Sequence, residues 1–137
     1  MATTKAFGLA ELIRHLSYDN TTGRLTTDTK LETAAQERSK SFSATGTTEQ
    51  NILTFAKADY RAAQVKIVAT YSGNYHFTSF LIVHDGTTTY DTEFGSVYSS
   101  SSLFTITSDI SGTDVRVRVT PSNSSTTFKY SIEYVDA

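Results

Sequence analysis

Hydrophobic and polar residues alternate along the chain from Ser41 onward, and this period of two constrains the fold more than any other feature. In residues 114–120, Val115, Val117 and Val119 occupy every second position, and residues 128–134 repeat the pattern. Successive side chains of a strand point to opposite faces, so this alternation predicts strands with one buried face. The abundant Thr and the 8 Tyr and 8 Phe residues favour strands as well.

Turn residues separate the alternating stretches at short intervals. Asp85-Gly86 lies between two apolar runs, which is a strong signal of a tight hairpin, and residues 72–74, 99–102 and 121–125 are further turn segments. Such spacing predicts an all-β fold. We expect an antiparallel β-sandwich of jelly-roll or immunoglobulin-like topology, with about seven or eight strands.

One stretch departs from strict alternation. Residues 75–84 are apolar at four consecutive positions, Phe80-Leu81-Ile82-Val83. A strand that is apolar on both sides is typical of the middle of a covered sheet. This stretch is therefore predicted to be a central strand buried on both faces.

The first forty residues show a different pattern, which predicts an amphipathic helix over residues 5–17 followed by an extended connector. Residues at positions 9, 12, 13 and 16 follow the spacing of one helix face, and Arg24–Thr27 resembles a small hairpin strand. A helix this short is marginal alone, so its apolar stripe is expected to pack on the sandwich or on another subunit. The residues of this expected interface are Phe7, Leu9, Leu12, Ile13 and Leu16. We therefore expect an anchor and connector in residues 1–40 and the sandwich in residues 41–137.

Composition narrows the classes of function. With 137 residues there is room for one domain and a short extra segment. There is no Cys, which excludes disulfides, cysteine–zinc sites and thiol catalysis, and the net charge of −2 gives no reason to expect nucleic acid or an anionic membrane as a partner. No apolar run approaches the length of a membrane span, and the first residues do not resemble a secretory signal.

Residues that carry chemistry are few and dispersed. The three His residues show no metal-ligand spacing, no nucleophile motif or glycine-rich phosphate loop is present, and we expect no catalytic residue, no metal and no cofactor. Asp91 and Glu93 share one side of a predicted strand, and a solvated face or ion pairs with Arg116 and Arg118 are simpler interpretations than paired catalytic acids. Arg116, Arg118 and Lys129 are expected to form one basic stripe on neighbouring strands that faces a partner.

Residues 60–134 resemble a small β-domain found in structural proteins of tailed bacteriophages, especially marine cyanophages. Five pieces carry the resemblance in order, with Ser41–Phe55 as a matching lead-in strand. These pieces are Asp59-Tyr60-Arg61-Ala62-Ala63, Phe80-Leu81-Ile82-Val83-His84-Asp85-Gly86-Thr87, Tyr90-Asp91-Thr92-Glu93-Phe94-Gly95, Asp109-Ile110-Ser111-Gly112 and Val115-Arg116-Val117-Arg118-Val119-Thr120-Pro121. They cover more than half of the chain.

The resemblance implies a non-enzymatic virion protein, made in the host cytoplasm and displayed on the particle. A capsid decoration (cement) protein attached through its N-terminal segment is slightly favoured. The implied partners are other virion proteins, namely the major capsid protein or tail and baseplate proteins. Self-association is also implied, with a trimer favoured.

Two other functions stay open. One is a tail-fibre or baseplate module that binds a host receptor or surface glycan, since Tyr71, Tyr75, Tyr90 and Tyr98 are predicted on or near loops where a sugar ring can stack. A hydrolase acting on host polysaccharide has only the Asp91 and Glu93 pair in its favour.

Overall fold

The computed structural model of the chain describes residues 16–19, 24–27 and 38–137. The chain divides into two units, residues 1–32 and 33–137. In the first unit, β1 (Leu16–Asp19) and β2 (Arg24–Thr27) pair as antiparallel strands, so the predicted hairpin strand at Arg24–Thr27 is confirmed. The predicted helix over residues 5–17 lies outside the described residues, except for its last two. Those two residues belong to β1, because pairing with β2 satisfies their backbone groups in place of a last helical turn.

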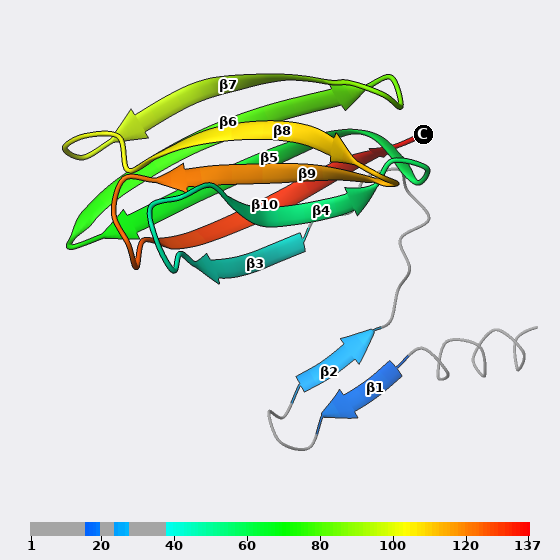
Figure 1. Ribbon diagram of the computed structural model, residues 1–137. Coiled ribbons are helices and arrows are strands. Elements are labelled where there is room, and N and C mark those ends of the chain that lie inside the picture. Colours follow the sequence, from blue (N-terminus) through cyan, green and yellow to red (C-terminus); the bar gives the residue numbers. More distant parts are fainter. Residues whose placement is uncertain (1–15, 20–23, 28–37) are drawn as a thin grey trace, which may run out of the picture. The chain divides into compact units, whose positions relative to one another are not determined.

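The second unit is an antiparallel sandwich of a five-stranded and a three-stranded sheet, as predicted (Figure 1). The large sheet has the order β3-β10-β5-β6-β7 and the small sheet the order β4-β9-β8. The strands are β3 (Arg38–Ser43), β4 (Gln50–Ala56), β5 (Tyr60–Tyr71), β6 (Asn74–His84), β7 (Thr89–Tyr98), β8 (Phe104–Ser111), β9 (Asp114–Pro121) and β10 (Thr127–Asp136).

The strand order pairs the beginning of the sandwich segment of the chain with its end. Its first strand pairs with its last, β3 with β10, and its second with its second last, β4 with β9. The hairpins β5–β6–β7 and β8–β9 lie between these pairs, and Gly86 adopts a positive φ of 98° in the predicted Asp-Gly turn between β6 and β7. The Asp85 carboxylate accepts hydrogen bonds from the backbone N–H groups of Thr87 and Thr88, which fixes this turn.

The hydrophobic core lies between the two sheets. Val115, Val117 and Val119 of β9 are fully buried, as their alternation predicted. They face Val65 and Ile67 of β5, together with buried residues of β6 and β10, across the space between the sheets. Aromatic rings close both ends of this core through the contacts Phe104–Phe128, Phe55–Tyr134 and Tyr60–Tyr134.

A bulge interrupts the alternation in β4. The register of β4 against β9 shifts between Asn51 and Leu53, so Ile52 has no residue opposite it, and Ile52 and Leu53 are both buried although they are neighbours. The Tyr130 hydroxyl, from the opposite sheet, donates a 2.6 Å hydrogen bond to the Ile52 carbonyl oxygen. The two sheets are thus joined by a buried polar contact at the bulge.

The prediction that residues 75–84 are buried on both faces is wrong. The side of β6 that faces the small sheet is buried, but Phe77, Leu81 and Val83 on the other side are 40–46% exposed. The reason is that the small sheet covers only one side of the large sheet, and no other strand of the second unit covers the other side.

Candidate functional site

The exposed hydrophobic residues of the sandwich gather on the large sheet. All ten large hydrophobic residues that are exposed in the described part of the chain belong to β5, β6, β7 or β10. The strand registers place nine of them on the side away from the small sheet, which we call the outer face. These nine are Val68, Tyr75, Phe77, Leu81, Val83, Tyr90, Phe94, Val97 and Val135.

The registers arrange the outer face in rows that run across the strands. The first apolar row consists of Val135, Ala62, Val83 and Tyr90, each directly opposite the next. The second apolar row consists of Val68, Phe77 and Val97 and continues through Lys129 on β10 to Ser41 on β3.

Two mixed rows lie between the apolar rows. One holds Glu133, Gln64, Leu81 and Thr92, and the other holds Ser131, Lys66, Ser79 and Phe94. Opposite charges therefore occupy neighbouring rows, with Glu133 in one and Lys66 in the other. Phe94 on the edge strand β7 is 68% exposed, the most of the ten.

A shallow hollow of about 460 Å³ lies over the first apolar row, lined among others by Ala62, Leu81, Val83 and Val135. Tyr90 borders the hollow, and its hydroxyl donates a 3.1 Å hydrogen bond to the Asp85 carboxylate. That hydrogen bond raises the pKa of Tyr90, and the Thr87 hydroxyl and the turn N–H groups lower the pKa of Asp85 well below its usual range. The ring at the edge of the hollow is thus tied to the β6–β7 turn.

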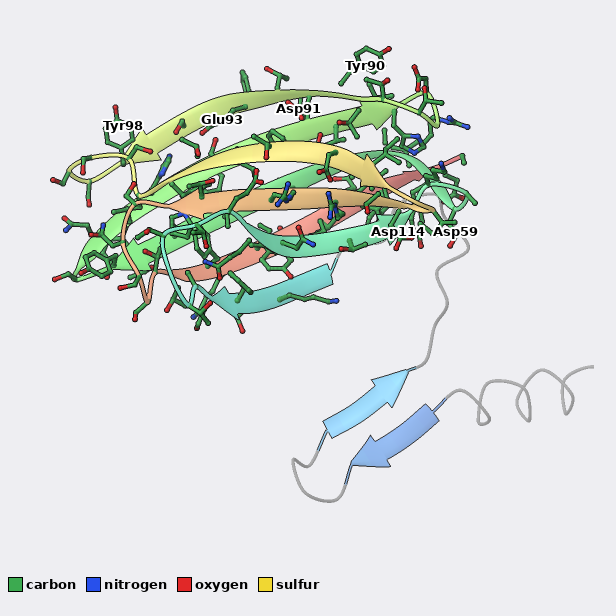
Figure 2. All side chains as sticks on the ribbon, in the orientation of Figure 1. Asp59, Tyr90, Asp91, Glu93, Tyr98 and Asp114 are labelled. Carbon is green, nitrogen blue, oxygen red and sulfur yellow. The ribbon has the colours of Figure 1, made fainter. Side chains whose placement is uncertain are left out.

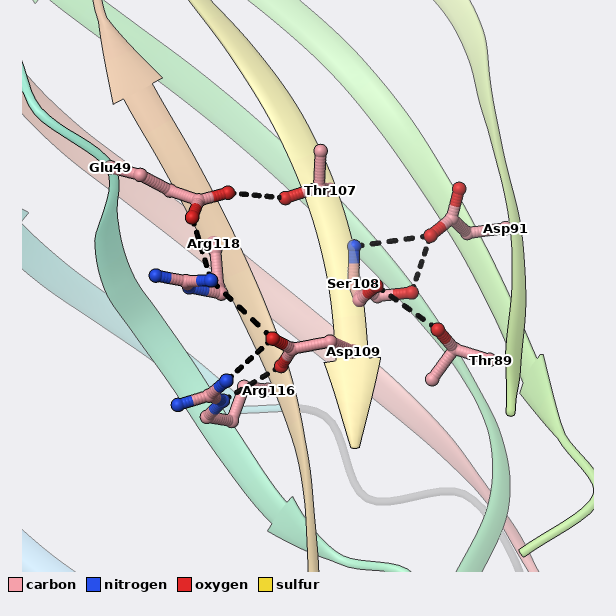
Figure 3. A network of polar contacts seen from close by, with 8 residues as sticks. All are labelled: Glu49, Thr89, Asp91, Thr107, Ser108, Asp109, Arg116 and Arg118. Atoms are coloured by element: carbon pink, nitrogen blue, oxygen red, sulfur yellow. Dashed lines mark hydrogen bonds and ion pairs between the residues drawn. The ribbon is translucent and has the colours of Figure 1, made fainter. Parts of the chain in front are cut away.

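The outward side of the small sheet is polar and its charges are paired (Figure 3). Arg116 holds Asp109 through two hydrogen bonds, one of them 2.7 Å from Nε to Oδ1, and Arg118 reaches Glu49 at 2.6 Å and Asp109 at 3.4 Å. The hydrogen bond from Arg116 lowers the pKa of Asp109. Two cations meet two anions here, so this surface offers little free charge.

The predicted basic stripe of Arg116, Arg118 and Lys129 does not form. Its arginines lie on β9, in the small sheet, whereas Lys129 lies on β10, in the large sheet. Between β9 and β10, at residues 122–126, the chain passes from the small sheet to the large sheet. The alternation within each strand does not show which sheet the strand joins. Lys129 instead joins the outer face of the large sheet.

Asp91 and Glu93 share one side of β7, as predicted, but neither pairs with Arg116 or Arg118. The Asp91 carboxylate accepts hydrogen bonds from the backbone N–H and the hydroxyl of Ser108 on β8, where Figure 3 shows it beside Thr89. Glu93 Oε1 lies 4.0 Å from Nε2 of the buried His76. Asp91 therefore connects β7 to β8 at the open side of the sandwich, whereas Glu93 lies near a ring on the adjacent strand β6.

The four tyrosines considered for sugar stacking do not form one platform. Tyr90 and Tyr98 lie at opposite ends of β7 (Figure 2), and Tyr98 packs edge-on against His76. Tyr75 is on the outer face at the far end of β6 from Tyr90, and Tyr71 packs partly buried against the core.

Within the described residues, no group of three or more His, Asp or Glu side chains is placed to hold a metal ion. No helix in the same part of the chain has the length and apolar character of a membrane span. The expected interface residues Phe7, Leu9, Leu12 and Ile13 lie outside the described residues, and Leu16 is the first residue of β1.

Comparison with known proteins identifies structures of similar fold. No family model and no curated protein matches the chain. The tailspike protein of Acinetobacter phage vB_ApiP_P1 superposes with a TM-score of 0.52 at 14% identity, over 83% of this chain and 25% of its own. The tailspike protein of Acinetobacter baumannii phage AM24 gives a TM-score of 0.47 at 8% identity, over 76% of this chain and 26% of its own. The first superposition shows that this sandwich shares its fold with part of a phage tailspike, and this chain spans a quarter of that protein's length.

The outer face was missed by the sequence analysis, although its signal was present. The apolar outward positions of β6 predict a covering layer on both sides of the strand. Counting the strands available shows that three strands of the small sheet cannot cover both sides of a five-stranded sheet. An unpaired apolar side on such a strand therefore indicates a surface for a partner.

Proposed function

We propose that this chain is a non-enzymatic structural domain of a bacteriophage tail appendage, such as a tailspike, tail fibre or baseplate component. The observation that carries the proposal is the sandwich fold shared with the tailspike protein of phage vB_ApiP_P1 over 83% of this chain. The resemblance of residues 60–134 to virion structural proteins supports the same class. In this proposal the protein resides in the virion and its neighbours are other tail proteins.

A structural role agrees with how the sandwich uses its acidic residues. Asp91, Glu93 and Asp109 each face a partner on another strand, namely Ser108, His76 and Arg116. The Asp91 and Asp109 carboxylates connect β7 to β8 and β8 to β9 through hydrogen bonds, whereas Glu93 lies 4.0 Å from the His76 ring. The contacts of Asp91 and Asp109 are thus accounted for by the stability of the sandwich.

Capsid decoration is the competing proposal. The sequence analysis slightly favours it, but the similar structure is a tail protein, which supports the tail appendage instead. In both proposals, residues 1–40 attach the sandwich to the particle.

Immunogold electron microscopy tests the location. Antibody raised against the purified chain is applied to particles of the phage that encodes it, with particles of an unrelated phage as the control. We expect gold at the tail. Gold distributed over the capsid would favour decoration, and particles without gold would overturn both proposals.

A further inference from the structure

We infer that the outer face of the large sheet binds a second copy of this chain. The inference rests on the surface of the sandwich alone and holds wherever the protein is located. Its starting point is the contrast between the two sides: nine exposed large hydrophobic residues lie on the outer face, while the exposed side of the small sheet carries Thr residues and paired charges. An isolated domain gains nothing from this contrast, since exposed apolar area costs free energy in water.

The outer face is large enough for a stable contact. Four strands and four rows cover about 19 Å by 27 Å, roughly 500 Å² of projected surface, from the ordinary spacings of strands and residues. The accessible area of protruding side chains is larger than this projection. The face therefore approaches the roughly 800 Å² per partner of an ordinary protein interface.

The pattern of charge on the face identifies a second copy as the occupant. Glu133 and Lys66 lie in the two neighbouring mixed rows, between the two apolar rows. In the simplest packing, two copies lie face to face and are related by a two-fold axis. The axis runs parallel to the rows and passes between the row of Gln64 and the row of Lys66. It lays the first apolar row of each copy over the second apolar row of the other, and brings Glu133 of each copy opposite the row that contains Lys66 of the other.

Other occupants fit this face less well. A sugar chain would need stacked rings, but Tyr75 and Tyr90 lie at opposite ends of the face. An anionic surface would need clustered cations, whereas the two lysines of this face, Lys66 and Lys129, lie in different rows and Glu133 lies in the row next to Lys66.

Pairing through the edge of β7 is also disfavoured. A bulge in the register of β7 against β6, with Gly95 at a φ of 65°, breaks the regular edge. Asp91 and Glu93 point to the inner side of this strand, and inward charges and bulges are common means of blocking an added strand. These features favour contact through the face over an added strand at β7.

Light scattering after size-exclusion chromatography of the full chain tests the inference. We expect the wild type to assemble, with a mass of two or more 15.0 kDa chains. Leu81→Glu places a charge in the middle of the face and should give single chains. Thr105→Glu, at an exposed position on β8 of the small sheet, is the matched control and should assemble like the wild type.

Two outcomes would overturn the inference: a wild type that is a single chain, or an assembly that survives Leu81→Glu. Leu12→Glu is the second control, because the apolar stripe predicted for residues 5–17 is the alternative cause of assembly. If Leu12→Glu dissociates the protein and Leu81→Glu does not, the contact lies in that stripe. Circular dichroism of every variant shows that the sheet is retained.

A charge exchange tests the two-fold packing. Glu133→Lys and Lys66→Glu should each weaken self-association about tenfold or more, because like charges then meet across the contact. A mixture of the two variants should associate like the wild type, since opposite charges meet again. A mixture that remains as single chains would overturn the packing.

Discussion

At the scale of single residues, a buried hydroxyl joins the two sheets where the backbone of β4 is irregular. The Tyr130 hydroxyl donates to the carbonyl of Ile52, which the bulge leaves without a residue opposite it. Tyr130→Phe should lower the free energy of unfolding by about 1–3 kcal/mol, because a buried carbonyl loses its hydrogen bond. Urea unfolding of the two proteins measures the difference, and an unchanged midpoint would show that the contact is not stabilising.

A second buried hydroxyl is expected to have the opposite effect. Thr78 on β6 is fully buried, and its hydroxyl has no hydrogen-bond partner among the described residues. Thr78→Val keeps the shape of the side chain and removes the unpaired polar group, so the free energy of unfolding should rise by about 1 kcal/mol. A loss of stability in the same urea experiment would contradict this expectation.

His76 makes the stability of the sandwich depend on pH. It is 1% exposed, its Nδ1 accepts a hydrogen bond from the backbone N–H of Leu103, and its Nε2 contacts the Ser96 hydroxyl at 2.7 Å. Burial lowers the pKa of His76 below the ordinary value of 6.5, and the charge of Glu93 offsets part of this effect. The neutral ring is therefore the form that the folded protein holds.

The direction of the pH effect follows from where the proton binds first. As the pH falls below about 6.5, His76 of the unfolded chain is protonated before His76 of the folded protein, so the free energy of unfolding decreases. The slope is at most about 1.4 kcal/mol per pH unit for one proton. Urea unfolding between about pH 7 and pH 5 measures this slope.

His76→Gln is the control and should flatten that dependence. Carboxylates with lowered pKa values, such as Asp109, affect stability only at more acidic pH, as they become protonated. A slope that persists in His76→Gln would assign the effect to another group.

At the scale of elements, the open side between β7 and β8 is closed by side chains instead of a strand ladder. Asp91 accepts the backbone N–H of Ser108, and the Thr89 hydroxyl donates to the Ser108 carbonyl oxygen. Asp91→Ala should speed hydrogen exchange in β8 while lowering the free energy of unfolding by only about 1 kcal/mol, because the contact is local and exposed. Thr92→Ala, on the other side of β7, is the control. Equal exchange in both variants would show that Asp91 does not hold the two strands together.

The same scale shows what the sequence could predict. Alternation in β9 and the Asp85-Gly86 turn are local signals, so they identified the strands and the hairpin correctly. The bulge at Ile52 was not predicted because it depends on the register of β4 against β9, two strands that lie far apart in the chain. The prediction that Lys129 shares a surface with Arg116 and Arg118 was also wrong, because the position of Lys129 depends on which sheet its strand joins.

The candidate face was hidden for a related reason. The apolar residues on β6 indicate that both sides of the strand are suited to burial. They do not indicate whether the layer that covers a side belongs to the same chain. The strand order shows that the small sheet lies on the inner side and therefore does not cover the outer side of β6.

At the scale of the whole molecule, a face covered by another copy links stability to protein concentration. Folded chains that assemble are stabilised by mass action, so the melting temperature of the wild type should rise by roughly 2–4 °C for each tenfold increase in concentration. Leu81→Glu should melt at the same temperature at every concentration, whereas Thr105→Glu should follow the wild type. Differential scanning calorimetry over such a series measures the effect. A wild-type melting temperature that is independent of concentration would mean that the outer face stays exposed to water, and its nine hydrophobic residues would then need a different partner.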